Sequence, residues 1–114
     1  MNASTRHTHT PGPWMASQAF FFGHDSWQIT GTNGDTSPFL CRLTDDTPDY
    51  AANARLIASS PELLSALAGC ADALREAGKD FARANPHAVR PNLYELHEKA
   101  ARAAIAKATG GNAS

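Results

Sequence analysis

Residues 38–63 read PFLCRLTDDTPDYAANARLIASSPEL, and the spacing of the apolar side chains changes within them. In residues 38–44, Phe39, Cys41 and Leu43 alternate with their neighbours, which predicts a β-strand with these three side chains on one face. After residue 47 the apolar residues recur every three or four positions, as in an α-helix. Ser60 followed by Pro61 is the signal for the start of a further helix, with Ser60 as its cap and Pro61 at its first position. The chain is therefore predicted to be α+β, with its strands first and its helices second.

The residues before this stretch predict two more short strands. Residues 18–22 are rich in phenylalanine, and residues 27–30 alternate apolar and polar side chains. Residues 23–26 have the composition of a turn, and residues 31–35 contain the Asn-Gly pair that is typical of hairpins. We expect a three-stranded antiparallel sheet in the N-terminal half.

Three helices are predicted to pack with this sheet, over residues 49–58, 61–84 and 91–108. The second helix carries an apolar seam whose residues are separated by 4, 3, 4, 3 and 4 positions. This heptad-like spacing is typical of a helix that packs against a partner helix. The seam comprises Leu63, Leu67, Cys70, Leu74, Ala77 and Phe81. The third helix is rich in alanine, which permits close approach, so the last two helices are expected to form an antiparallel hairpin.

The length of 114 residues leaves room for a single domain. We expect residues 1–10 to be a flexible arm, residues 11–109 a single α+β domain, and residues 110–114 a frayed tail. Cys41 and Cys70 are interpreted as buried free thiols in a reducing compartment. The N-terminal residues lack the apolar core of a signal peptide, and no stretch approaches the ~20 apolar residues of a membrane span. The formal net charge of −1 makes direct nucleic-acid binding an unfavoured interpretation.

No constellation of catalytic or metal-binding residues stands out. The five histidines are scattered, and neither cysteine has a neighbour at the spacing of a zinc ligand. There is no Gly-x-Ser-x-Gly motif, and residues 31–35 lack the Lys-Ser/Thr of a phosphate-binding loop. We therefore expect no enzymatic activity, no metal and no cofactor.

Aromatic residues are more numerous in the first half than one face of a short sheet can cover. They are Trp14, Phe20, Phe21, Phe22, Trp27 and Phe39. Because consecutive strand residues point to opposite faces, Phe20 to Phe22 must place rings on both. Either a partner or a second copy covers the second face, or the core is unusually aromatic. Trp14, Phe21 and Trp27 are the aromatic residues that we predict at a binding surface.

Two segments resemble a widespread group of small bacteriophage and prophage proteins. They are HTPGPW at residues 9–14 and ANARLIASSPELL at residues 52–64, and the similarity spans roughly residues 8–67. The resemblance implies a phage accessory protein in the host bacterial cytoplasm that binds a host factor. Its specific form is an inhibitor of a host defence complex, with a CRISPR effector as the expected target.

Asn53 and Arg55 are the polar residues of the second motif without an obvious structural duty. Asn53 is interpreted as a buried amide that bridges helix and sheet, and Arg55 as the partner of Asp45 or Asp46. Alternatively, both line a ligand or partner site. In this hypothesis the protein is an oligomer that sequesters a nucleotide signal. Asn53, Arg55 and Trp14 would line its pocket, because an aromatic ring that stacks and a guanidinium are suited to bind a nucleotide. A virion or regulatory role is the third hypothesis.

Overall fold

The computed structural model describes residues 9–111, which fall into two compact units. One unit is His9–Leu63, and the other begins at Leu64. We predicted a single domain over residues 11–109; the two units are described separately below. Most of the predicted flexible arm, residues 1–8, lies outside the described residues.

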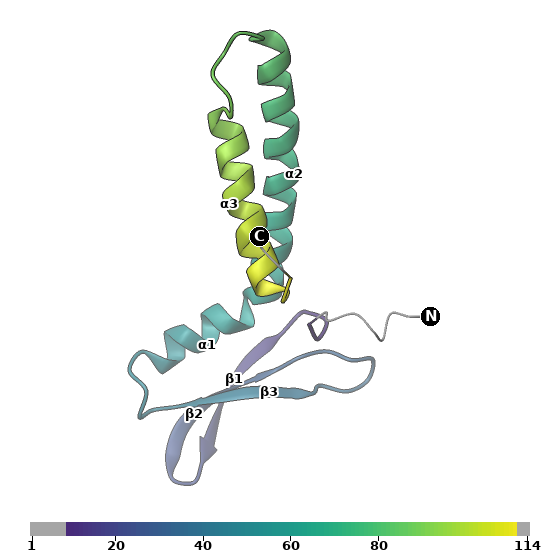
Figure 1. Ribbon diagram of the computed structural model, residues 1–114. Helices are drawn as coiled ribbons and strands as arrows, with labels where there is room; N and C mark the ends of the chain where they lie inside the picture. The colour runs from purple at the N-terminus through teal and green to yellow at the C-terminus, as the bar shows by residue number, and fades with distance from the viewer. Residues whose placement is uncertain (1–8, 112–114) are drawn as a thin grey trace. The chain divides into compact units, whose positions relative to one another are not determined.

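The first unit contains the predicted antiparallel sheet (Figure 1). Its strands are β1 (Met15–Phe21), β2 (His24–Thr30) and β3 (Phe39–Thr44), in the order β1-β2-β3. The α+β fold class is thus confirmed, but the first turn is shorter than predicted. It consists of Phe22 and Gly23, at φ 48° and 81°, so that residues 24–26 belong to β2. Two consecutive residues with positive φ are the requirement of a type I′ hairpin, whose twist matches that of the strands.

The second hairpin uses the Asn-Gly pair, as the sequence predicted. Asn33 and Thr36 exchange backbone hydrogen bonds of 3.0 Å, and Gly34 adopts φ 63° at the first position between them. Glycine accepts this left-handed conformation without steric cost. The pairing of β2 with β3 then shifts between Ile29 and Thr30, which leaves Leu40 without an opposite residue.

Helix α1 (Tyr50–Ala58) packs on one face of the sheet, mainly against β2. Ala54 on this helix and Ile29 on β2 are both fully buried, and they form the centre of the core. Strand alternation places Trp27 and Leu43 on the same face as Ile29. Gln28 and Arg42 must therefore point to the opposite face.

The HTPGPW segment is tied to this unit by backbone contacts. The backbone N–H and the hydroxyl of Thr32 donate hydrogen bonds to the carbonyls of Pro11 and Pro13, at 3.3 and 2.9 Å. Gly12 lies so close to Pro61 that an added Cβ would be 2.9 Å from the proline Cβ. The two sequence motifs therefore meet in space and fix each other.

The second unit holds the predicted hairpin of α2 (Ser60–Ala84), from Leu64 onward, and α3 (Leu93–Ala108) (Figure 1). The predicted seam borders its interior: Leu67, Leu74 and Ala77 are half-buried, and the ring of Phe81 lies 6.1 Å from that of Tyr94 on α3. The buried positions are Ala71 and Gly78 on α2 and Ala101 on α3. Small residues allow the helix backbones to approach closely, so the most deeply buried positions lie beside the leucines of the seam. Cys70 is exposed rather than buried, and Cys41 in the sheet is half-buried, so the interpretation of two buried thiols is wrong.

Both ends of α3 are capped by local hydrogen bonds. Asn92 and Glu95 form a capping box at its start, and the side-chain amide of Asn92 also donates to the carbonyl of Gly78 at 3.3 Å. At its end, the backbone N–H groups of Gly110 and Gly111 donate to the carbonyls of Lys107 and Ala106, which is a Schellman motif. Residues 112–114 of the predicted frayed tail lie outside the described residues.

None of the helices in residues 9–111 combines the length and the hydropathy of a membrane span.

Candidate functional site

The sheet face opposite α1 holds an arginine between two aromatic rings. The guanidinium carbon of Arg42 lies 3.9 Å from the ring centroid of Phe21 and 5.0 Å from that of Phe39. The same guanidinium donates a 3.0 Å hydrogen bond to the side chain of Gln28. Its Nε atom is buried and has no hydrogen-bond partner among the described residues. Cation–π contact with two rings compensates part of that lost hydration.

The presence of Phe39 on this face corrects a prediction. Simple alternation assigned Phe39 to the side of Cys41 and Leu43, away from Arg42. The shift in pairing between Ile29 and Thr30 inserts one residue into β3, and one extra residue reverses the side to which the strand's earlier side chains point. The irregularity thus brings the second ring to Arg42.

The β1–β2 turn extends this surface beyond the sheet. Phe22 sits at the tip of the turn with 86% of its surface exposed, and its ring contacts Phe21 at a centroid distance of 4.4 Å. Phe39 and Met15 are 55% and 60% exposed. We call the set Met15, Phe21, Phe22, Phe39 and Arg42 the aromatic face. Side chains of this kind at the surface are characteristic of interaction sites.

The end of the sheet near this turn is acidic. Asp45 accepts hydrogen bonds from the ring of His24 at 2.9 Å and from the backbone N–H of Asp25 at 3.3 Å. The hydroxyl of Thr44 donates a hydrogen bond to Asp46, and this bond holds the pKa of the Asp46 carboxyl below its ordinary value. Over His9–Leu63 there are two basic residues and six acidic residues, a formal charge of −4. This unit is therefore much more acidic than the whole chain.

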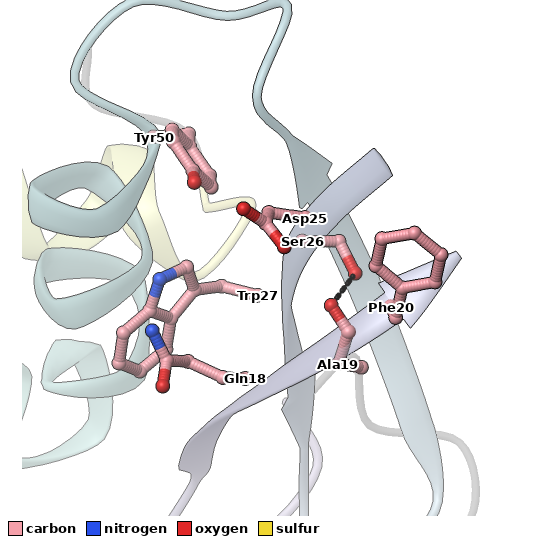
Figure 2. A pocket seen from close by; sticks show the side chains of 7 residues that line it. All are labelled: Gln18, Ala19, Phe20, Asp25, Ser26, Trp27 and Tyr50. Atoms are coloured by element: carbon pink, nitrogen blue, oxygen red, sulfur yellow. Dashed lines mark hydrogen bonds between the residues drawn. The ribbon is translucent and has the colours of Figure 1, made fainter. Parts of the chain in front are cut away.

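A separate polar pocket of about 290 Å³ opens on the α1 side of the sheet (Figure 2). Its polar lining comes from Gln18 and Asp25 on the strands and from Tyr50 at the start of α1, with Trp27 beside them. Within residues 9–111, no three histidine, cysteine, aspartate or glutamate side chains are grouped as metal ligands would be. The pocket could accept a small polar group; the hydroxyl of Ser26, which also lines it, donates a 3.0 Å hydrogen bond to the carbonyl of Ala19.

The five predicted site residues do not converge on one place. Phe21 belongs to the aromatic face, whereas Trp27 lines the pocket on the other side. Trp14 is half-buried, and its indole N–H donates to the carbonyl of Thr10 at 3.0 Å. Asn53 is exposed, so it is not the buried bridge that we predicted. Arg55 is exposed as well, and the structure records no ion pair for it within residues 9–111.

Sequence reasoning missed Arg42 and Tyr50 as site residues. Arg42 had a usable signal, because it is the one charged residue inside an otherwise uncharged strand. Its contact with Phe39 could not be predicted, because it depends on the pairing irregularity. Tyr50 reads as an ordinary core residue of a helix, and only the packing of α1 brings it to the pocket.

Comparison with known proteins gives the family. The chain matches the family described as Salmonella phage P22 protein Y8K6 over residues 1–112. The chain belongs to the Y8K6 family. No curated protein and no solved structure matches it. Membership in the Y8K6 family confirms the phage character that the two motifs implied, and it makes this chain a phage accessory protein.

Proposed function

We propose that this phage accessory protein is not an enzyme and that it acts in the host cytoplasm by binding a host defence protein through the aromatic face. The observation that carries the proposal is Phe22, which is both strained and exposed. A left-handed conformation costs a residue with a side chain about 1–2 kcal/mol, and the turn would favour asparagine or glycine there. At 86% exposure the ring recovers little of this cost within its own chain. A partner that buries the ring would recover it.

The surroundings of Phe22 suit a protein partner. Phe21, Phe39 and Arg42 provide the aromatic and arginine side chains that are enriched where protein interfaces are most strongly stabilised. The acidic charge of −4 on the same unit favours a basic partner surface. It also disfavours direct contact with nucleic acid, whose phosphates are negative.

A CRISPR effector is the specific target that we propose. Such effectors hold their guide–target duplex in a positively charged channel. An acidic unit with exposed rings is complementary to a channel of that kind. Binding there would compete with nucleic acid, and a stoichiometric inhibitor needs no catalytic group.

The test is direct binding of the full chain to a panel of purified CRISPR effector complexes, measured with and without target DNA. We expect a complex of defined stoichiometry that target DNA weakens. Phe22→Asn should reduce the affinity at least tenfold. Val89→Asn is the matched control, because Val89 is also 86% exposed but lies in the loop before α3. Absence of binding across the panel, or equal losses in both variants, would contradict the proposal.

The nucleotide sponge is less well supported by the geometry. Asn53 and Arg55 are two positions apart on α1, so their side chains point about 200° apart around the helix. Trp14 is engaged by the carbonyl of Thr10. Thermal-shift measurements with cyclic nucleotides would distinguish this hypothesis, because a tight ligand raises the melting temperature.

A further inference from the structure

The pocket on the α1 side of the sheet is built from two directly opposed residue pairs on neighbouring strands. Strand β1 pairs with β2 so that Gln18 lies opposite Trp27 and Phe20 lies opposite Asp25. Because opposed residues and every second residue share a face, these four side chains project from the same side of the sheet. Tyr50, at the start of α1, points its hydroxyl toward them (Figure 2). Three aromatic rings therefore surround one carboxylate and one amide.

The polar groups of this pocket have no partners inside the protein. Within residues 9–111 the structure records no hydrogen bond or ion pair for the Asp25 carboxylate, the Gln18 amide or the Tyr50 hydroxyl. The backbone of Asp25, in contrast, is held on both sides. Its N–H donates to the Asp45 carboxylate at 3.3 Å, and its carbonyl accepts from the Asp45 backbone N–H at 3.1 Å. Asp25 is thus fixed by its backbone, while its carboxylate is available to a ligand.

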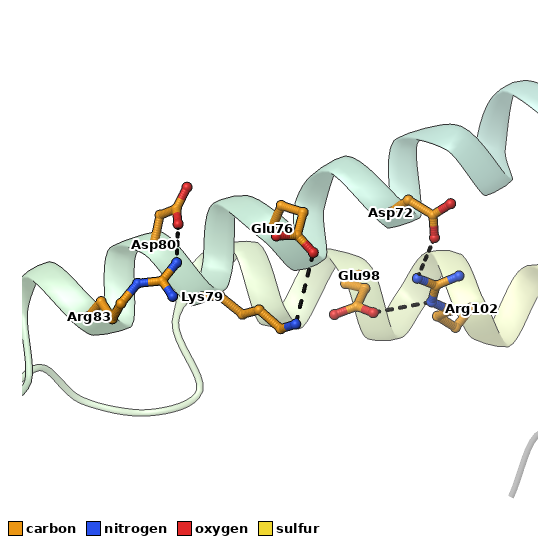
Figure 3. Close-up of polar contacts among 7 residues, drawn as sticks. All are labelled: Asp72, Glu76, Lys79, Asp80, Arg83, Glu98 and Arg102. Carbon is orange, nitrogen blue, oxygen red and sulfur yellow. Dashed lines mark hydrogen bonds and ion pairs between the residues drawn. The ribbon is translucent and has the colours of Figure 1, made fainter.

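Carboxylates on the helical hairpin find their cations within the same two helices (Figure 3). Asp72 accepts a hydrogen bond from the guanidinium of Arg102 at 2.9 Å. Asp80 forms an ion pair with Arg83, one helical turn away. For Asp25 the described part of the chain supplies no such cation. A cation from outside the protein can therefore pair with this carboxylate without displacing an internal partner.

The charges around the pocket favour a cation over an anion. Residues 44–50, between β3 and α1, contain Asp45, Asp46 and Asp49 and neither lysine nor arginine. These three negative charges exceed the partial positive charge of about half a unit at the start of a helix. The formal charge of the whole sheet unit is −4. The potential at the pocket therefore attracts cations and repels anions such as phosphates.

We infer that this pocket binds a guanidinium group, carried either by an arginine side chain of another protein or by a small molecule. A guanidinium is planar and presents five N–H donors in a fixed fork. Asp25 offers two carboxylate oxygens for a bidentate pair with two of these donors. The side-chain oxygens of Gln18 and Tyr50 are further acceptors. The ring of Trp27 offers a surface on which the planar group stacks.

The size and rim of the pocket suit one guanidinium with its aliphatic stem. A volume of about 290 Å³ lies at the lower end of the range of about 300–1,000 Å³ for ligand pockets. Phe20 at the rim is 73% exposed, and an aliphatic stem would cover part of its ring. A lysine ammonium has the same charge, but it lacks the plane for stacking and the paired donors that match a carboxylate. The pocket should therefore prefer arginine to lysine.

The test is an NMR titration of the ¹⁵N-labelled full chain with N-acetyl-arginine amide, with N-acetyl-lysine amide as the comparison. The indole N–H signal of Trp27 should shift and saturate, with a dissociation constant on the order of 1 mM. The lysine compound should bind at least tenfold more weakly. The indole N–H of Trp14 is an internal control, because it is bonded to the Thr10 carbonyl outside the pocket and should not shift.

Two substitutions assign the binding to the pocket. Asp25→Asn removes the charge and one acceptor, and it should raise the dissociation constant at least tenfold. Asp35→Asn is the matched control, because it removes the same charge from the turn between β2 and β3 and should leave binding within about twofold. Tyr50→Phe keeps the ring and removes only the hydroxyl, so a severalfold loss in this variant decides the question if Asp25→Asn misfolds.

Two further ligands distinguish the sources of the guanidinium. Tighter binding of a capped Gly-Arg-Gly peptide than of methylguanidinium would assign the site to an arginine of another protein, and the reverse order would assign it to a small molecule. Either order supports the inference. A Trp27 signal that no guanidinium shifts, equal binding of the arginine and lysine amides, or equal losses in Asp25→Asn and Asp35→Asn would overturn it. Phe22→Asn should leave guanidinium binding unchanged, so the inference does not rest on the proposed effector binding.

Discussion

Gly12 and Pro61 lie in contact across 49 positions of sequence, and the contact leaves no space for a side chain on the glycine. Replacing Gly12 with valine should destabilise the sheet unit by about 1–3 kcal/mol, because the proline ring is rigid and cannot yield. Urea unfolding followed by tryptophan fluorescence measures the change, since Trp14 is two residues away. Gly69→Ala is the control, because open space surrounds that glycine on a helix. It should stabilise by about 0.5–1 kcal/mol. A neutral Gly12→Val would contradict the contact.

Phe22→Asn should separate stability from binding. Asparagine tolerates the left-handed conformation at φ 48°, which relieves about 1 kcal/mol of strain. The lost ring contact with Phe21 offsets part of this gain. The free energy of unfolding should therefore stay unchanged or rise by up to about 1 kcal/mol, while affinity for the partner falls. A loss of stability above about 1 kcal/mol would mean that the ring serves the fold instead.

Asn92 should contribute more to stability than an ordinary helix cap. Its side chain accepts from the backbone N–H of Glu95 at 2.9 Å and also donates to the Gly78 carbonyl on the other helix. Asn92→Ala removes both interactions and should cost about 1–2 kcal/mol in thermal or chemical unfolding. Asn85→Ala is a suitable control, because its side chain bonds only the last turn of its own helix. Equal effects of the two changes would argue against the cross-helix bond.

The hairpin should lose stability in acid through Glu95. Hydrogen bonding from Arg90, and then from the backbone of Asn92, lowers the pKa of the Glu95 carboxyl in the folded state. A carboxyl with a lowered folded pKa contributes stability that is complete above its ordinary pKa of 4.5 and is lost as pH falls through the folded value. Glu95→Gln should flatten this part of the stability profile. Urea midpoints from pH 6 downward compare the two proteins, and identical slopes would contradict the assignment.

Gly78 should tolerate no large side chain. An added Cβ would lie 3.1 Å from Cγ of Glu95 and 3.5 Å from Cβ of Tyr94. Gly78→Val should therefore push α3 away and destabilise the hairpin by about 1–3 kcal/mol. The melting temperature, measured by following the loss of helix content on heating, reports this destabilisation. Gly69→Val provides the comparison on the same helix, and similar melting temperatures for the two variants would disprove close packing at Gly78.

The sequence by itself determined the secondary structure and its order. Local signals specify these features: period-two alternation for the strands, Asn33-Gly34 for a hairpin, and Ser60-Pro61 for the start of α2. The same signals were sufficient to predict the antiparallel sheet and the helical hairpin. The HTPGPW and PELL motifs also indicated phage ancestry, which the family match confirms.

Only the tertiary structure decided which side chains meet. The seam of leucines on α2 was predicted to form the contact with α3, but its members are at most half-buried, and the most deeply buried positions are Ala71 and Gly78 beside it, where small residues allow a closer approach. The irregularity between Ile29 and Thr30 moved Phe39 to the side of Arg42, which no local pattern indicates. The spacing of apolar residues identifies a helix or a strand. Which face of that element becomes buried depends on how closely the neighbouring backbone can approach it.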